Sequence, residues 1–129
     1  MPVFVYGTLM EGGCRHSYMT GSRFLGRAQT MPEYRLFNCG SYPAMVRSSQ
    51  GVAIQGELWE VSADCLSVLD EVEGVSEQLY AREAIDVTLL SPGDGEALSL
   101  VRAWTYLYVR STQSMADLGD HWRHELENA

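Results

Sequence analysis

The run Val3-Phe4-Val5-Tyr6-Gly7-Thr8-Leu9 is where the fold begins, because an apolar stretch typical of a β-strand ends there on a glycine. Residues 3–6 are β-branched or aromatic, which predicts a short, buried strand. Gly7 then permits positive φ or the close approach of another group to the main chain. The free N–H groups of such a loop, beside a Thr hydroxyl and a Tyr ring, can bind a carboxylate or a developing oxyanion. The same pattern also fits a strand that ends in an ordinary turn.

Strand patterns continue through most of the chain. Apolar and β-branched runs predict strands at residues 24–30, 34–38, 42–46 and 52–61, the last with a bulge or tight bend at Gly56. Two longer strands at residues 79–90 and 98–109 flank Ser91-Pro92-Gly93-Asp94-Gly95, the clearest hairpin signal in the sequence. Period-two alternation places on one face of the second long strand Leu98, Leu100, Arg102, Trp104, Tyr106 and Tyr108.

Helix signals are fewer. A helix over residues 62–73 is predicted, because Ser62 is a suitable N-cap, Gly74 suits the position after the last turn, and apolar residues recur at helical spacing between them. A short helix within residues 15–19 is also expected. Near-helical spacing predicts a docked C-terminal helix that carries Met115, Leu118, Trp122 and Leu126.

Strands outnumber helices and the hairpin favours antiparallel pairing, so the sequence predicts one α+β domain over residues 1–129, built on a curved sheet or small barrel. Hydrophobic residues make up 46% of the chain and charged residues 20%, which is ordinary for a globular protein. No run reaches the roughly 18 apolar residues of a membrane span, and the start lacks a secretory signal pattern. We therefore expect a cytoplasmic protein.

The charge balance excludes some partners. Nine basic against seventeen acidic side chains give a formal net charge of −8, which repels phosphate backbones and anionic membranes. Nucleic-acid and membrane partners are therefore not expected. The cysteines are odd in number and lack a CxxC pair, as is typical of reduced thiols. The histidines form neither an HExxH motif nor a Cys/His cluster, so no metal site is expected.

Acidic residues gather where a helix disfavours them. Asp70, Glu71 and Glu73 fall in the last turn of the predicted helix, beside unpaired carbonyl groups and the negative end of the macrodipole. Repulsion among the three adds to this, and both effects would raise the pKa of a carboxyl group toward the range useful for proton transfer. A general base is one interpretation of this cluster. A solvated acidic face, screened by salt, is the other.

Motifs in a fixed order indicate a family. They are Tyr6-Gly7-Thr8-Leu9 after the first strand, Tyr42-Pro43-Ala44, Gly56-Glu57-Leu58-Trp59-Glu60-Val61, Leu69-Asp70-x-x-Glu73-Gly74 and Tyr80-x-Arg82. Each motif is weak alone, but together and in register they resemble the γ-glutamylcyclotransferase-like family, which includes the γ-glutamylamine cyclotransferases. The resemblance extends from Val3 to about Tyr108.

The resemblance implies a small, mixed, mostly antiparallel β-barrel with a few short flanking helices and a cavity that opens at residues 6–9. The family's catalytic glutamate falls on Glu73. By the same alignment Tyr80 matches a family tyrosine just beyond the catalytic helix, and Tyr106 matches a strand tyrosine approximately. The γ-glutamyl group would be held by the loop residues Tyr6, Gly7, Thr8 and Leu9.

The implied reaction needs no cofactor. A γ-glutamyl amide carries its own nucleophile, the α-amino group, which is protonated at neutral pH and must lose a proton before it can attack. With Glu73 as general acid and base, the substrate would cyclise to 5-oxoproline and release an amine or amino acid. The leaving group is left open among amino acids, peptides, lysine side chains, polyamines and other amines. The acidic net charge favours a cationic one.

Two other functions compete with this one. A non-catalytic module could keep the barrel and bind a small molecule, since a fold does not guarantee activity. A thiol-dependent amidase would use Cys14 with His16, but a spacing of two places these side chains on opposite sides of an extended chain, and no orienting acid is evident. Arg82 is interpreted as an ion-pair partner, and the three tryptophans as core residues.

Overall fold

The computed structural model describes residues 1–128. Its strands are β1 (Pro2–Val5), β2 (Arg23–Thr30), β3 (Tyr34–Asn38), β4 (Pro43–Arg47), β5 (Gln55–Glu60), β6 (Tyr80–Leu90) and β7 (Ala97–Tyr108). In these residues the helical elements are α1 (Ala63–Val72) and two short 3-10 helices, η1 (His16–Met19) and η2 (His124–Asn128). Each expected strand is present, with ends shifted by a few residues. None of the described helices has the length and apolarity that a membrane span requires.

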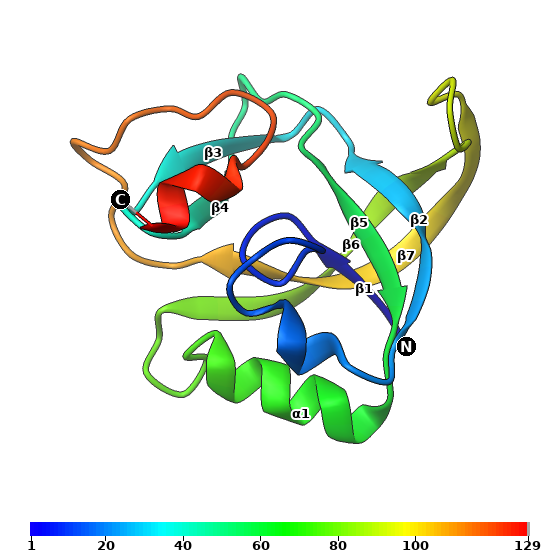
Figure 1. The fold of residues 1–129 in the computed structure, drawn as a ribbon. Coiled ribbons are helices and arrows are strands. Elements are labelled where there is room, and N and C mark those ends of the chain that lie inside the picture. The colour runs from blue at the N-terminus through cyan, green and yellow to red at the C-terminus, as the bar shows by residue number, and fades with distance from the viewer. Residues whose placement is uncertain (129) are drawn as a thin grey trace.

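Within residues 1–128, five strands close into a barrel in the order β1-β5-β2-β6-β7 (Figure 1). Neighbouring strands are antiparallel except β1 and β7, which are parallel and meet at Val3 and Trp104. The mixed, mostly antiparallel barrel is therefore confirmed. β3 and β4 form a separate two-stranded sheet beside it.

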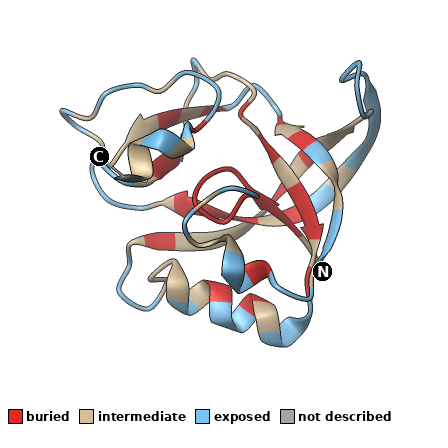
Figure 2. Cartoon of the chain, viewed as in Figure 1, coloured by how far each residue is buried: buried red, intermediate tan, exposed pale blue. Residues whose placement is uncertain are grey.

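Strand β1 lies in the core between β5 and β7. Its Val3 and Phe4 side chains are fully buried, and Figure 2 shows buried residues concentrated on β1, on β5 and in the loop that follows β1. Gly56 of β5 faces this strand, and a Cβ atom there would run into the Val5 carbonyl and the Phe4 ring. The glycine thus permits a close approach of two strands, whereas the register shift of the β2–β5 pair lies on β2, between Phe24 and Gly26.

Helix α1 has the ends that its sequence predicts. The Ser62 hydroxyl accepts a hydrogen bond from the Cys65 N–H at 3.1 Å, and Gly74 has a φ of 67°, which is the left-handed conformation that terminates helices. The N–H of Leu79 then donates to the Gly74 carbonyl at 3.1 Å. This turn joins the C-terminal end of α1 to the start of β6, and Glu73 is the last residue before it.

The expected C-terminal helix through Met115, Leu118, Trp122 and Leu126 is wrong. Residues 109–123 follow an irregular path, and helical structure is limited there to the short η2. The backbone of this stretch bonds to other elements instead: Asn38 N–H donates to the Ala116 carbonyl, and Leu118 N–H to that of Leu36. Trp122 is still buried, at 3% exposure. The apolar spacing therefore indicates that side chains of this segment are buried, but its backbone forms hydrogen bonds with the edge of β3 instead of forming a helix.

Candidate active site

The loop after β1 is irregular yet buried, because its carbonyl groups find partners within the loop and the segment that follows it. Tyr6, Thr8 and Leu9 are each 6% exposed or less. The bonds to successive carbonyls are Met10 N–H to Gly7 O at 3.1 Å, Arg15 N–H to Thr8 O at 3.0 Å, His16 Nδ1–H to Leu9 O at 2.8 Å and Gly13 N–H to Met10 O at 2.8 Å. A buried carbonyl group without a hydrogen-bond partner would cost free energy, so these four bonds stabilise the conformation of the loop.

The N–H groups of the same loop are arranged differently. Among the described residues, the backbone N–H groups of Gly7, Thr8 and Leu9 have no protein acceptor. Buried N–H groups that have no protein acceptor are rare, and a ligand or an ordered water molecule usually accepts their hydrogen bonds. Consecutive free N–H groups of this kind can bind a carboxylate or an oxyanion.

Gly7 is required by a close contact and not by its φ, which is not positive. A Cβ atom on Gly7 would lie 2.6 Å from Cγ of Pro43, a contact that real Cβ atoms do not make. Pro43 belongs to β4, so the separate two-stranded sheet packs directly on the loop at this point. The Tyr6-Gly7-Thr8-Leu9 and Tyr42-Pro43-Ala44 motifs are therefore two sides of one contact.

A cavity with about 320 Å³ of empty space, including its mouth, lies against this loop. Its walls include every residue that the sequence assigned to the site: Tyr6, Gly7, Thr8, Leu9, Glu73, Tyr80 and Tyr106. Sequence reasoning did not assign Phe4, Val5, Tyr42 and Pro43, which also line it. The Tyr42-Pro43-Ala44 motif was the available signal for the last two.

Glu73 is the acidic group in this cavity. Its side chain is only partly exposed, and within residues 1–128 its carboxylate has no hydrogen-bond or ion-pair partner. Burial raises the pKa of Glu73 from 4.5 to about 7, and the positive charge of Arg15 partly offsets this rise. The sequence argument expected a raised pKa but gave the wrong principal cause, because desolvation dominates and not repulsion within the acidic cluster.

Asp70 does not repel Glu73 as expected because it is paired elsewhere. Its Oδ1 lies 2.9 Å from Nε of Arg82, whose guanidinium stacks 4.4 Å from the ring centre of Trp104. The same oxygen accepts a hydrogen bond from the hydroxyl of Tyr106 at 2.7 Å. The interpretation of Arg82 as an ion-pair partner is confirmed, and this pair supports a tyrosine of the cavity wall.

Three of the four tyrosines that line the cavity donate their hydroxyl protons to acceptors within the protein. The hydroxyl of Tyr6 donates to the Tyr106 carbonyl, that of Tyr80 to the Pro43 carbonyl, and that of Tyr106 to Asp70. Burial raises the pKa of each above its ordinary value, so all three stay protonated at neutral pH. Their oxygen atoms can still accept hydrogen bonds, for example from an ammonium group. None of the three can act as a base near pH 7.

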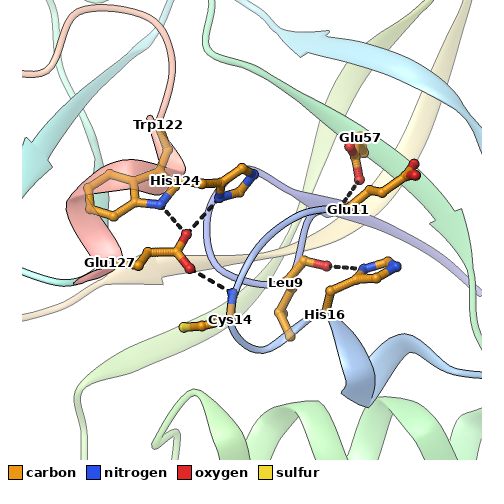
Figure 3. Close-up of polar contacts among 8 residues, drawn as sticks. All are labelled: Leu9, Glu11, Cys14, His16, Glu57, Trp122, His124 and Glu127. Carbon is orange, nitrogen blue, oxygen red and sulfur yellow. Dashed lines mark hydrogen bonds and ion pairs between the residues drawn. The ribbon is translucent and has the colours of Figure 1, made fainter.

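Cys14 and His16 do not form a nucleophile–base pair. Figure 3 shows the two side chains directed away from each other, and His16 Nδ1 is bonded to the Leu9 carbonyl. Burial raises the pKa of the Cys14 thiol, which is the opposite of what an activated nucleophile needs. The described residues also contain no group of three or more His, Cys, Asp or Glu side chains arranged to hold a metal ion.

Comparison with known proteins gives consistent results. A family model described as "Gamma-glutamyl cyclotransferase, AIG2-like" matches residues 3–124. A Vibrio cholerae protein, whose γ-glutamylcyclotransferase name is provisional, is 36% identical over 120 residues that span 92% of each chain. The γ-L-glutamyl-butirosin B γ-glutamyl cyclotransferase of Niallia circulans is 30% identical over 132 residues, which span 98% of this chain and 79% of that protein.

A solved structure shares the architecture. The crystal structure of a mouse AIG2-like protein superimposes with a TM-score of 0.77 and 26% sequence identity, covering 95% of this chain and 87% of that one. The correspondence includes nearly all of the barrel and its flanking elements.

Proposed function

Because the chain belongs to the gamma-glutamyl cyclotransferase, AIG2-like family, we propose that it is a γ-glutamyl cyclotransferase with Glu73 as its general acid and base. The substrate is a small γ-glutamyl amide, and the products are 5-oxoproline and an amine or amino acid. The activity follows the family, whereas the roles of single residues rest on the geometry of the cavity.

One observation carries the assignment of the base. Among the residues that line the cavity, Glu73 is the one whose pKa lies near neutral pH, at about 7. A base with this pKa is partly ionised at neutral pH and also retains its proton readily, which suits a group that must take up and return protons. Gly7, Thr8 and Leu9, whose backbone N–H groups have no protein acceptor among the described residues, line the same cavity.

The reaction begins with proton transfer. The substrate's α-ammonium group binds near Glu73 and the acceptor oxygens of the tyrosines, and the carboxylate of Glu73 removes a proton. The freed α-nitrogen then attacks the γ-carbonyl carbon of the same molecule and forms a five-membered ring. Holding the substrate in this folded shape contributes several kcal/mol to catalysis, of the order that intramolecular positioning provides.

Charge then has to be stabilised and removed. As the new C–N bond forms, negative charge gathers on the γ-carbonyl oxygen, and free loop N–H groups stabilise either this oxygen or the substrate's carboxylate. The bond from the γ-carbon to the leaving nitrogen breaks as Glu73 protonates that nitrogen. Two protons in all pass from the attacking to the leaving nitrogen, and no water is consumed.

The leaving group is not fixed by this reasoning. The name of the Niallia circulans relative identifies an antibiotic amine, butirosin B, as the group that its γ-glutamyl unit is attached to. For this chain, the acidic net charge of −8 supports a cationic leaving amine over an acidic one.

The proposal is tested by 5-oxoproline release from γ-glutamyl amino acids, γ-glutamyl-lysine isopeptide and γ-glutamyl amines, measured by mass spectrometry. Glu73→Gln is assayed in parallel, with Glu71→Gln as the matched control because Glu71 is an exposed glutamate in the last turn of α1, two residues before Glu73. We expect release by the parent and by Glu71→Gln, and none by Glu73→Gln. Binding of γ-glutamyl compounds without any 5-oxoproline would favour the non-catalytic binding module instead.

A further inference from the structure

A buried carboxylate that does not line the cavity is bonded to the segment that follows the loop after β1. The side chain of Glu127, in η2, is 3% exposed and accepts hydrogen bonds from three N–H groups (Figure 3). Its Oε2 binds Trp122 Nε1 and His124 Nδ1, and its Oε1 binds the backbone N–H of Cys14, each at 2.6 Å. These bonds lower the pKa of Glu127 although burial opposes this.

The partners divide between two distant parts of the chain. Trp122 and His124 belong to the C-terminal segment and occupy one carboxylate oxygen, so the other oxygen is directed at Cys14. The His124 ring also covers Gly12, since a Cβ atom there would lie 3.4 Å from its Cδ2. The C-terminal segment thus fixes residues 12–14 across 113 positions of sequence.

Cys14 lies between the residues that support the loop. Gly13 N–H binds the Met10 carbonyl and Arg15 N–H binds the Thr8 carbonyl. Gly13 is also so close to Thr8 O that a Cβ atom would not fit. The hydrogen bond from Cys14 N–H to Glu127 therefore also helps to keep the neighbouring Gly13–Met10 and Arg15–Thr8 hydrogen bonds in place.

We propose that Glu127 is a positioning residue for ligand binding. Through the N–H of Cys14, it keeps residues 13–15 packed on residues 7–10 and so holds in place the cavity-lining loop with the unpaired N–H groups of Gly7, Thr8 and Leu9. This proposal rests on the proposed function for the identity of the ligand, a γ-glutamyl compound. It adds a residue that touches neither substrate nor Glu73.

The test uses a substitution that releases one bond selectively. In Glu127→Gln, an amide NH₂ group replaces one of the two carboxylate oxygens, and it cannot accept a hydrogen bond. We expect the NH₂ group to take the place of Oε1, which accepts one bond, and the amide oxygen to take the place of Oε2, which accepts two. The Cys14 N–H then loses its acceptor. Trp122→Phe also removes one bond to this carboxylate but leaves the Cys14 bond intact. Glu125→Gln makes the same chemical change at an exposed position of η2.

The readouts are KM and kcat for 5-oxoproline release, together with amide hydrogen exchange in residues 7–15 without substrate. For Glu127→Gln we expect KM to rise about tenfold, the equivalent of one lost hydrogen bond, with kcat within about threefold, because Glu73 lies on a separate element. Exchange in residues 7–15 should increase. Trp122→Phe should lower Tm but keep KM and this exchange near the parent values, and Glu125→Gln should change neither.

A Glu127→Gln protein with parental KM, or with exchange no faster than that of Trp122→Phe, would overturn the positioning role. A fall in kcat at constant KM would do the same, because it indicates a loss of folded enzyme. If the parent releases no 5-oxoproline, the proposed function fails, while hydrogen exchange still decides whether Glu127 holds the loop.

Discussion

The hydroxyl group of Tyr106 donates a hydrogen bond to Oδ1 of Asp70 at 2.7 Å, and this bond fixes which side of the tyrosine oxygen faces the cavity. Asp70 is itself paired with Arg82 at 2.9 Å. The donor proton of Tyr106 thus points away from the ligand space, and its lone pairs remain available as acceptors there. A residue of α1 that does not line the cavity therefore orients the hydroxyl group of one that does.

Asp70→Ala is expected to lower kcat/KM about tenfold, because the Tyr106 hydroxyl then loses its acceptor and can turn its proton toward the cavity. Tyr106→Phe should cause a similar loss. In the double variant the two effects should not add, since both act through one hydroxyl group. The kinetic constants of the parent, the two single variants and the double variant form a double-mutant cycle. Fully additive losses would show that Asp70 does not act through Tyr106.

Gly7→Ala should destabilise the protein by about 1–3 kcal/mol, which is typical of an extra atom forced into a packed site. The new Cβ atom meets Cγ of Pro43 at 2.6 Å, so the loop or β4 must move. KM should rise as well, because the displaced residue carries one of the free N–H groups. Thermal unfolding and kinetics measure both effects. Pro43→Ala in the Gly7→Ala background should restore part of the loss, and no restoration would mean that another contact is responsible.

Much of this site was predictable because its signals are local. The first strand, the helix N-cap at Ser62 and the helix end at Gly74 are each indicated by residues close to them in the sequence. The path of residues 109–123 was not predictable, since its backbone bonds to Leu36 and Asn38 of β3. Nor was the reason for the raised pKa of Glu73, because its burial depends on elements brought together only by the fold.

The ionisation of Glu73 should also make stability depend on pH. Its pKa is about 7 in the folded protein and 4.5 ordinarily, so between these values the folded state binds more protons than the unfolded state. The stabilisation from the protonated form is complete below pH 4.5 and is lost as the pH rises through 7, by up to about 3 kcal/mol.

Glu73→Gln removes this loss and should therefore have a higher Tm than the parent at pH 8, by several degrees, but not at pH 4.5. Thermal melts at both pH values measure the difference. A Tm difference that is the same at pH 4.5 and pH 8 would show that Glu73 ionises normally.

Cys14→Ser should retain kcat/KM within about twofold of the parent. The thiol takes no part in the proposed chemistry, and the contact that matters at this position is made by the backbone N–H. The assay of 5-oxoproline release on the variant measures this directly. Loss of turnover, with Tm unchanged, would revive the thiol-dependent mechanism.

The central claim is that Glu73 is the base, and the pH dependence of kcat/KM for 5-oxoproline release tests it most directly. Between pH 5 and pH 8.5 the parent should show a rate that falls about tenfold per unit below about pH 7, where Glu73 becomes protonated. Glu73→Gln should be at least about 100-fold slower at pH 8, the usual contribution of a general base. A parental rate that is flat across this range, or equal rates for parent and Glu73→Gln, would contradict Glu73 as the base.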